Sequence, residues 1–400
     1  MTESSLPRLD DLDVDGKRVI VRCDLNVPLK AGVITDDLRV RASVPTLEAL
    51  LGRGARLAVC SHLGRPKGKV VDDLRLAPVG RRLGELLNRD VKSLGVTVGD
   101  EALEACASDV DVVLLENLRF DPGEEANDAG FASALAALGQ AYVNDAFGSS
   151  HRAHSSVVGV PQLLPAAAGL LLAEEVEKLE RLLHDPPSPF LAVLGGAKVS
   201  DKLGVIANLL ERVDTIIVGG AMAFTLLAAR GLDVGRSRVE SDRIGEVRHV
   251  LRSADDRGVE VLLPTDVIAA ESPDDGAVHE TVPLERIGDR MGVDIGPQTS
   301  AAFAERIRSA RTVLWNGPMG IFEIPDYASG TETVAVAVAA ATKDGAYTVV
   351  GGGDSAAALK QLGMTDSVSH LSTGGGASLE LLEGRDLPGV AVLRKKGVSQ

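Results

Sequence analysis

Short runs of Val, Ile and Leu alternate with longer helix-like segments along most of the chain, and each run ends in glycine or polar residues. Such runs have the length of buried strands, and strands that alternate with helical segments are typical of βαβ units. The sequence therefore predicts an α/β fold with doubly wound parallel sheets. Aromatic residues make up only 3% of the chain, which suits close packing of helices on a sheet.

The chain has 400 residues, more than one domain usually contains. The segment from Leu170 to Leu183 is a strong helix candidate, with Glu174 and Lys178 spaced four residues apart on a charged face. Three prolines follow in "HDPPSPF", and they cannot continue a helix. We expect a connector between two domains here, with the division near residue 186, although an ordinary surface helix and loop would give the same pattern.

The net charge of -15 argues against a nucleic-acid or acidic-membrane partner. Cys23, Cys60 and Cys106 form no metal-like cluster, and buried free thiols in a reducing cytoplasm are the ordinary interpretation. The start of the sequence lacks the pattern of an export signal, and no apolar run reaches about 18 residues. We therefore expect a cytoplasmic protein without a membrane span.

In the first half, several predicted strands end in basic or hydrogen-bonding residues. Ligands of open α/β sheets bind beyond the carboxyl ends of the strands, so we expect these side chains to converge. Arginine forks bind carboxylate and phosphate oxygens, and the set predicts a small, multiply anionic substrate, although any single arginine can be a solvated surface charge. The set is Arg22, Asp24, Asn26, Arg39, His62, Arg65, Arg119, His151, Arg152 and His154.

His151 and His154 also admit a metal interpretation, because histidines three residues apart can share a helical face. No nearby carboxylate or cysteine completes a zinc-like set, so hydrogen bonding to an anion or capping of a turn is favoured. Neither histidine has an evident nucleophile and acid partner for triad chemistry.

The second half repeats a strand, glycine, helix pattern three times, which predicts a flat backbone surface for a nucleotide. In the first repeat, Lys198 and Lys202 are four residues apart, and on a helix both would face the same phosphates. In the last, "GGGDS", Asp354 would repel a phosphate unless a cation lies between them, so the turn predicts a nucleotide carried with Mg²⁺. The glycines could also serve only to make tight turns.

Two familiar phosphate motifs are excluded. The sequence contains no "GxxxxGK[ST]" loop of the Walker type. The stretch "GGGDSA" fits the loose dinucleotide pattern, but the next strand-like run, "SVSHLS", lacks the acid that would hold a ribose. A dehydrogenase is therefore a minor alternative.

Nine stretches, in order along nearly the whole chain, resemble phosphoglycerate kinase: "RCDLNVP", "ITDDLR", "SHLGRP", "LLENLRF", "NDAFGSSHRAHSS", "GGAKVSDK", "MGVDIGP", "WNGPMGIFE" and "GGGDS". The resemblance implies a monomer with two Rossmann-like domains joined by a helical hinge. It implies reversible phosphoryl transfer between 1,3-bisphosphoglycerate and ADP, giving 3-phosphoglycerate and ATP with Mg²⁺. The implied organisation is a triose-binding domain over 1–170 with a tail at about 385–400 packed on it, a hinge over 171–189 and a nucleotide-binding domain over 190–384.

The resemblance also assigns site residues. Those similar to the triose-binding set are Asp24, Leu25, Asn26, Arg39, His62, Leu63, Gly64, Arg65, Arg119 and Arg152. Those similar to the nucleotide-binding set are Gly196, Lys198, Lys202, Gly219, Gly220, Gly292, Asn316, Pro318, Glu323, Gly352, Gly353, Asp354 and Ser355, with Asp354 as the metal ligand and Glu323 on the ribose. Arg39 and Lys198 are the predicted catalytic residues.

The sequence departs mildly from the usual family pattern. Leu25 replaces a common phenylalanine, Ser149 and Ser150 replace Thr-Ala, and Ala221 replaces a glycine; Cys23 and Ser355 stand for a common valine and threonine. None of these changes removes a charged group that the chemistry needs. A non-catalytic, nucleotide-binding regulatory protein of the same fold is the alternative, but such a protein should have lost clamp residues, and all are present.

Overall fold

The computed structural model describes residues 5–397, which divide into two compact units. The first unit comprises the described residues up to Glu177 together with those from Asp386 onward, and the second is Lys178–Arg385. The boundary falls inside helix α7, Leu170–Leu183, which has the bounds that the sequence predicts. Residues 1–4 and 398–400 of the predicted domain ranges lie outside the described residues.

The first unit contains a six-stranded sheet in which every pair of neighbours is parallel, as the sequence predicts. In spatial order its strands are β5 (Val91–Ser93), β6 (Val112–Leu114), β4 (Arg56–Cys60), β1 (Arg18–Cys23), β7 (Ala141–Asp145) and β8 (Ala166–Ala168). The carboxyl ends of all six strands therefore lie at one edge of the sheet. A small hairpin of β2 (Leu29–Lys30) and β3 (Val33–Ile34) follows β1.

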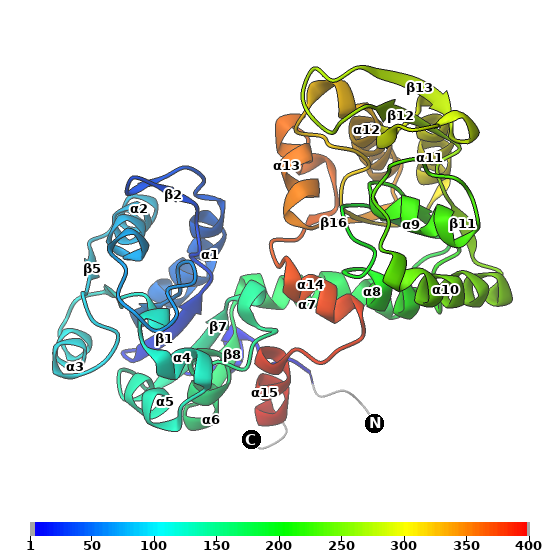
Figure 1. Ribbon diagram of the computed structural model, residues 1–400. Coiled ribbons are helices and arrows are strands. Elements are labelled where there is room, and N and C mark those ends of the chain that lie inside the picture. Colours follow the sequence, from blue (N-terminus) through cyan, green and yellow to red (C-terminus); the bar gives the residue numbers. More distant parts are fainter. Residues whose placement is uncertain (1–4, 398–400) are drawn as a thin grey trace. The chain divides into compact units, whose positions relative to one another are not determined.

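Helices cover both faces of this sheet (Figure 1). One face carries α1 (Leu38–Gly52) and α2 (Ala77–Leu87), whose buried residues share a core with alternate residues of β1 such as Val19 and Val21. Further helices of the unit are α3 (Asp100–Ala107), α4 (Pro122–Ala126), α5 (Ala129–Ala136) and α6 (Val160–Leu163), and its short helical turns include η3 (Leu118–Phe120) and η5 (Ser155–Gly159).

The other face of β1 and β7 presents Arg22 and Tyr142, because side chains alternate along a strand. The Tyr142 hydroxyl donates to the carbonyl of Ser156 in η5 at 2.6 Å, so η5 packs on this face. The C-terminal helix α15 (Pro388–Gly397) lies against η5 and β8, and the Gly389 amide donates to the Ser150 carbonyl at 2.9 Å. Helix α15 thus belongs to the first unit although it follows the second in the sequence.

The second unit is built on another six-stranded sheet, again parallel throughout. Its strands in spatial order are β11 (Glu260–Leu262), β10 (Thr215–Val218), β9 (Phe190–Leu194), β15 (Thr312–Asn316), β16 (Tyr347–Gly351) and β17 (His370–Leu371). Its helices are α8 (Leu203–Leu209), α9 (Met222–Ala229), α10 (Ile244–Arg257), α11 (Pro297–Ser309), α12 (Ser329–Lys343), α13 (Gly353–Gln361) and α14 (Gly376–Leu382). Trp315, fully buried, lies in the core that this sheet shares with α11 and α12.

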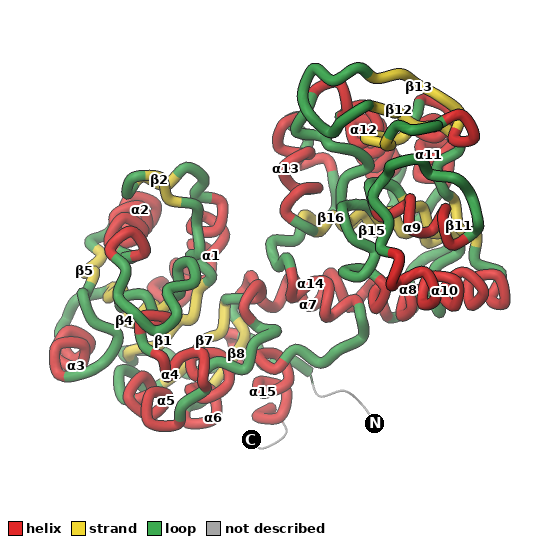
Figure 2. The backbone as a smooth tube through the Cα atoms, viewed as in Figure 1, coloured by secondary structure: helices red, strands yellow, loops and turns green. Residues whose placement is uncertain are grey.

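A three-stranded antiparallel sheet also belongs to the second unit, and the sequence pattern did not predict it (Figure 2). It consists of β13 (His279–Pro283), β12 (Asp266–Ala270) and β14 (Met291–Ile295), with β12 in the middle. An eight-residue connection joins β12 to β13, which pairs with one side of β12, and β14 follows after seven more residues and pairs antiparallel with the other side of β12. Across residues 5–397, no helix combines the length and apolar character needed to cross a membrane.

Candidate functional site

Four neighbouring strands of the first sheet, β6, β4, β1 and β7, bring the predicted substrate-binding residues to one edge. Arg22 is the penultimate residue of β1, Arg39 lies in the first turn of α1, and His62 follows β4. Arg119 lies in η3 after β6, and Arg152 follows β7. The remaining members of the predicted set, Asp24, Leu25, Asn26, Leu63, Gly64 and Arg65, lie in the loops that follow β1 and β4.

The loop after β4 is held by three side chains from two other segments. The Gly64 amide donates to Asn26 Oδ1 at 2.9 Å, and the Leu63 amide donates to Asn117 Oδ1 at 3.1 Å. Arg119 Nη1 donates to the Gly64 carbonyl at 2.7 Å. Asn26, Asn117 and Arg119 therefore fix the loop that carries His62 and Arg65.

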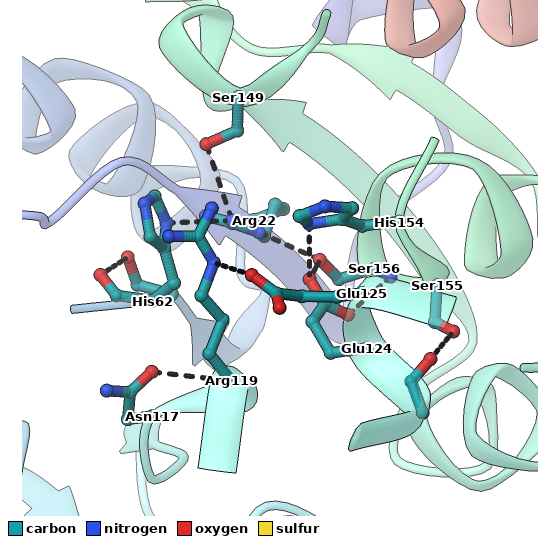
Figure 3. Close-up of polar contacts among 12 residues, drawn as sticks. Arg22, His62, Asn117, Arg119, Glu124, Glu125, Ser149, His154, Ser155 and Ser156 are labelled. Carbon is teal, nitrogen blue, oxygen red and sulfur yellow. Dashed lines mark hydrogen bonds and ion pairs between the residues drawn. The ribbon is translucent and has the colours of Figure 1, made fainter. Parts of the chain in front are cut away.

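Buried polar contacts behind this loop connect Arg22 to a glutamate (Figure 3). Arg22 Nε donates to Ser156 Oγ at 2.9 Å, and the Ser156 hydroxyl in turn donates to Glu124 Oε1 at 2.6 Å. The Ser156 amide donates to the other oxygen of Glu124 at 3.0 Å, and Ser149 Oγ lies 3.5 Å from Arg22 Nη2. Arg22 and Glu124 are both fully buried, so the serine bridge fixes the guanidinium in place.

The contact between Arg22 and His62 determines the tautomer of the histidine. Arg22 Nη2 lies 3.1 Å from His62 Nδ1, and a guanidinium can only donate, so Nδ1 must be the acceptor. Burial, followed by the charges of Arg22 and Arg119, lowers the pKa of His62 well below its usual value. His62 is thus a neutral imidazole whose proton lies on Nε2, ready to donate to an anionic oxygen.

Several guanidinium groups at this edge remain available to a ligand. Those of Arg65 and Arg152 form no hydrogen bond or ion pair with any residue in 5–397. Burial, and after it the charges of Arg152 and Arg22, lower the pKa of Arg119 to about 10, although Glu125 Oε1 lies 3.3 Å from its Nε. A bound anion would relieve this mutual repulsion of like charges.

Arg39 forms an ion pair with Asp24 through Nη1 and Oδ2. The Arg39 side chain keeps about a third of its surface exposed, whereas Asp24 is almost buried and its other oxygen, Oδ1, has no hydrogen bond to a described residue. Asp24 therefore orients Arg39 from the buried side and leaves part of the guanidinium accessible.

The two histidines considered for a metal do not form a metal cluster within the described residues. His154 Nδ1 lies 3.7 Å from Glu124 Oε1, and burial followed by the charges of Arg119 and Arg22 lowers the pKa of His154 to about 3. The histidine is neutral and belongs to the electropositive cluster behind the site.

The second unit contains a pocket of about 430 Å³, large enough for a nucleotide's base and sugar. It runs across the carboxyl ends of the sheet, from the α9 side to the start of α13. Six predicted nucleotide-binding residues line it: Gly196, Gly220, Gly292, Pro318, Glu323 and Asp354. The other predicted members, Lys198, Lys202, Gly219, Asn316, Gly352, Gly353 and Ser355, lie in the segments beside it.

The glycines after β9 and β10 let neighbouring loops pack backbone against backbone. Gly220 adopts a left-handed φ of +66°, and a Cβ there would lie 2.6 Å from the Gly196 nitrogen and 2.9 Å from the Pro318 carbonyl. A Cβ on Gly219 would lie 2.4 Å from Met319 Sδ. Only Gly196 of this group has open space where its Cβ would be. Tight turns therefore explain part of the glycine pattern, and a ligand surface explains the rest.

Lys202 is buried beside Asn316, and its ammonium donates to Asn316 Oδ1. Burial lowers the pKa of Lys202 to about 8, against the opposing charges of Asp201 and Asp354. The Asn316 amide nitrogen is buried without a hydrogen bond to the described residues and lies near the turn at Gly351 and Gly352. Two donors are thus directed toward the same glycine turn.

The predicted helical pairing of Lys198 and Lys202 is wrong. Helix α8 begins only at Leu203, and residues 195–202 form a loop and turns. Lys198 is exposed and Lys202 is buried. The two glycines after β9 let the chain turn across the sheet edge before it can start a helix.

Asp354 is the second residue of α13, beside the unpaired amides of the helix start. Its exposed carboxylate makes no hydrogen bond or ion pair with residues 5–397, and the same holds for Glu323. Ser355, in contrast, is buried, and its hydroxyl accepts the Gly317 amide at 2.7 Å, which fixes the loop after β15. A single carboxylate next to a phosphate-sized turn fits Mg²⁺, which takes one or two protein carboxylates and completes its shell with phosphates and water.

Sequence reasoning missed several residues of both sites. Glu124 and Ser156 gave no motif signal, because their role depends on contacts between α4, η5 and β1. In the pocket, Phe224, Arg238 and Met291 were not predicted. Phe224 could have been found, since it follows the glycine pair in a repeat that the sequence does reveal, but Arg238 lies in a loop without periodicity.

Comparison with known proteins settles the family. The sequence profile of phosphoglycerate kinase matches residues 9–385. This chain belongs to the phosphoglycerate kinase family. The resemblance inferred from the sequence motifs is therefore confirmed.

Curated relatives named phosphoglycerate kinase include those of Thermomicrobium roseum, 54% identical over 96% of this chain and 98% of the relative, and Rubrobacter xylanophilus, 55% identical over 96% and 97%. The solved phosphoglycerate kinase of Coxiella burnetii has a TM-score of 0.89 at 39% identity, covering 98% of this chain and all of the other. That of Pyrococcus horikoshii has a TM-score of 0.85 at 32% identity with the same coverage. The predicted fold of two parallel-sheet α/β domains is confirmed by the two sheets and by these phosphoglycerate kinase structures.

Proposed function

We propose that this chain catalyses the reversible transfer of a phosphoryl group between 1,3-bisphosphoglycerate and ADP, giving 3-phosphoglycerate and ATP, as a kinase of glycolysis. Its family places it among the phosphotransferases that use a carboxyl group as acceptor. The observation that carries the proposal is the arginine cluster at one edge of the first sheet. In a chain with a net charge of -15, this cluster is a site for a compact polyanion.

The triose binds to that cluster. Arg65 and Arg152 supply guanidinium groups that no described residue engages, and Arg119 adds a third group held at the Gly64 loop. Arginine forks bind phosphate and carboxylate oxygens bidentately. His62, neutral and protonated on Nε2, adds a hydrogen bond that does not depend on pH near neutrality.

The nucleotide binds in the second unit. Its base and sugar occupy the pocket, with Glu323 available to the ribose hydroxyls, and its phosphates lie along the turn between β16 and α13. Lys202 and the amide of Asn316 direct donors toward these phosphates. Asp354 would hold Mg²⁺, which would supply positive charge against the nucleotide phosphates.

The chemistry requires charge stabilisation more than proton transfer. In the ATP-consuming direction the acceptor is a carboxylate, which is already ionised near pH 7, so no general base is needed. The charge of the migrating group is spread over three equatorial oxygens. Arg39, oriented by Asp24, and Lys198, exposed in the loop after β9, stabilise these oxygens as the group moves.

Because the two ligand sets belong to different units, the units must approach each other for transfer, and closure also keeps water from competing as acceptor. Helix α7, in which the boundary between the units falls, is a natural part of the hinge. We propose that the enzyme works as a cytoplasmic monomer, since each chain carries both ligand sets and its three free cysteines are buried.

A coupled ATP-consumption assay with 3-phosphoglycerate tests the function, with one substitution in each unit. We expect Arg39→Ala to lower kcat by on the order of 10³ to 10⁵ while ADP affinity is retained. Asp354→Ala should weaken binding of Mg-ADP in calorimetry and leave binding of 3-phosphoglycerate unchanged.

Two results would contradict these assignments. Near-normal turnover of Arg39→Ala would remove that residue from catalysis. Weakened triose binding with normal Mg-ADP binding in Asp354→Ala would reject the metal role. Absence of turnover by the unaltered enzyme would reject the function itself.

A further inference from the structure

Arg238 differs from every other side chain that lines the pocket of the second unit. Among the described lining residues it alone is cationic, and it alone carries a side-chain hydrogen-bond donor. The other lining side chains are apolar, are absent because the residue is glycine, or are the carboxylates of Asp294, Glu323 and Asp354. Asp294 is already engaged, because it accepts the amides of Ile295 at 2.9 Å and Gly330 at 2.8 Å.

The guanidinium of Arg238 has no role inside the protein. The side chain is exposed and forms no hydrogen bond or ion pair with any residue in the described part of the chain. An arginine at the wall of a concave pocket, without a protein partner, keeps all five donors available to a ligand.

Hydrogen bonds on either side of Arg238 fix its backbone beside β14 and α9. These two elements form one end of the pocket. The neighbouring Ser237 accepts the Gly292 amide on its hydroxyl at 2.9 Å, and the Glu240 amide donates to Thr225 Oγ1 in α9 at 3.1 Å. At this end Gly292 packs on the ring of Phe224 so closely that a Cβ would lie 2.0 Å from Phe224 Cζ. Arg238 therefore stands beside a flat apolar surface suited to an aromatic base.

This end is remote from the phosphate end. Helix α9 follows β10, whereas Asp354 follows β16, and β9 and β15 lie between those two strands. Three strand spacings amount to roughly 14 Å. A nucleotide whose phosphates reach Asp354 thus has its base, and not its phosphates, beside Arg238.

We propose that Arg238 reads the purine base and favours 6-oxopurines, guanine or hypoxanthine, over adenine; the inference rests on the proposed nucleotide site. A 6-oxopurine presents two adjacent acceptors, O6 and N7, which match the guanidinium fork, whereas adenine presents a donor at N6 in place of O6. The guanidinium can only donate, so it pairs with both O6 and N7 of a 6-oxopurine but only with N7 of adenine.

Equilibrium binding tests the proposal independently of turnover. Calorimetry with ADP, GDP and IDP on the full chain gives the ratio of affinities for each 6-oxopurine nucleotide relative to ADP. We expect Arg238→Leu to lower both ratios about tenfold. Arg238→Lys, which keeps the charge but loses the fork, should lower them nearly as far. Arg252→Leu removes an exposed arginine from α10, outside the pocket, and should leave them unchanged.

An unchanged GDP-to-ADP ratio in Arg238→Leu would overturn the proposal. An equal loss for all three nucleotides, accompanied by weaker binding of inorganic tripolyphosphate, would overturn it in favour of a phosphate contact. A different result would reject the proposed function. In that case the unaltered enzyme would bind nucleotides with the expected base preference but would transfer no phosphoryl group to 3-phosphoglycerate. Since Arg238 makes no contact that folding needs, thermal unfolding of the variants should match that of the unaltered protein.

Discussion

Lys202 illustrates how a single buried side chain couples ligand binding to pH. Its ammonium is taken out of water and compensated mainly by Asn316, so its pKa falls to about 8. Near neutral pH the group is still charged, but the free enzyme loses that charge in a range where an exposed lysine would keep it. Phosphate oxygens would favour the charged form, so nucleotide binding and protonation of Lys202 support each other.

We expect the affinity for Mg-ADP to fall as the pH rises through about 8, approaching tenfold per pH unit well above that value. The affinity falls with rising pH because the complex contains protonated Lys202, whereas the free enzyme loses this proton above pH 8 or so. Calorimetry between pH 7 and 9.5 measures the effect. Lys202→Arg is the control, since arginine stays charged and should give a flat profile over this range. A flat profile for the unaltered enzyme would exclude Lys202 from phosphate binding.

At the scale of elements, the triose edge depends on three segments that meet behind it. Glu124 comes from α4, Ser156 from η5 and Arg22 from β1, and the serine joins the two charges across the sheet face. A buried carboxylate that loses its charge would free Ser156 and with it the orientation of Arg22 and His62. Because Glu124 is fully buried behind the site, we expect it to act by positioning Arg22 through Ser156.

Glu124→Gln keeps the shape of the side chain and removes its charge. We expect the KM for 3-phosphoglycerate to rise roughly tenfold, because a hydrogen bond to a charged group is weakened, while the KM for ATP stays unchanged in the other unit. Ser156→Ala should give a similar rise, and the double variant should be less than additive. Glu101→Gln, on the exposed face of α3, serves as control. A parallel rise in both KM values would indicate general destabilisation instead.

Elements with a local sequence signal were predictable, and elements that depend on distant contacts were not. Helix α7 and the parallel strands were predictable because apolar periodicity and charge spacing are local signals. The antiparallel sheet of β12, β13 and β14 was not, since β14 pairs with β12 across the intervening strand β13 and this pairing leaves no local signal. The loop at 195–202 was read as a helix because Lys198 and Lys202 have helical spacing, yet the glycines before them turn the chain first. Glu124 contacts Ser156 from a distant part of the sequence, and Arg238 lines the pocket from a loop without periodicity, so neither gave a local signal.

At the scale of the whole molecule, the proposed ligand sets belong to different units, and the proposed transfer requires both. Small-angle scattering should therefore show contraction when 3-phosphoglycerate and a Mg-bound, non-hydrolysable ATP analogue are both present, and less change with either ligand alone. The forward scattering should also correspond to a monomer of 41.7 kDa. Unchanged dimensions in the doubly liganded state would contradict closure, and a doubled mass would contradict the monomer.

The chain returns to its first unit only after the second is finished, since α15 packs on η5 and β8. The second unit is therefore synthesised before α15, and until then the first unit lacks that helix. A nascent chain stalled before Asp386 would lack α15, so the apolar surface that Val390 and Leu393 cover in the folded protein would be exposed. We expect chaperones to bind this surface.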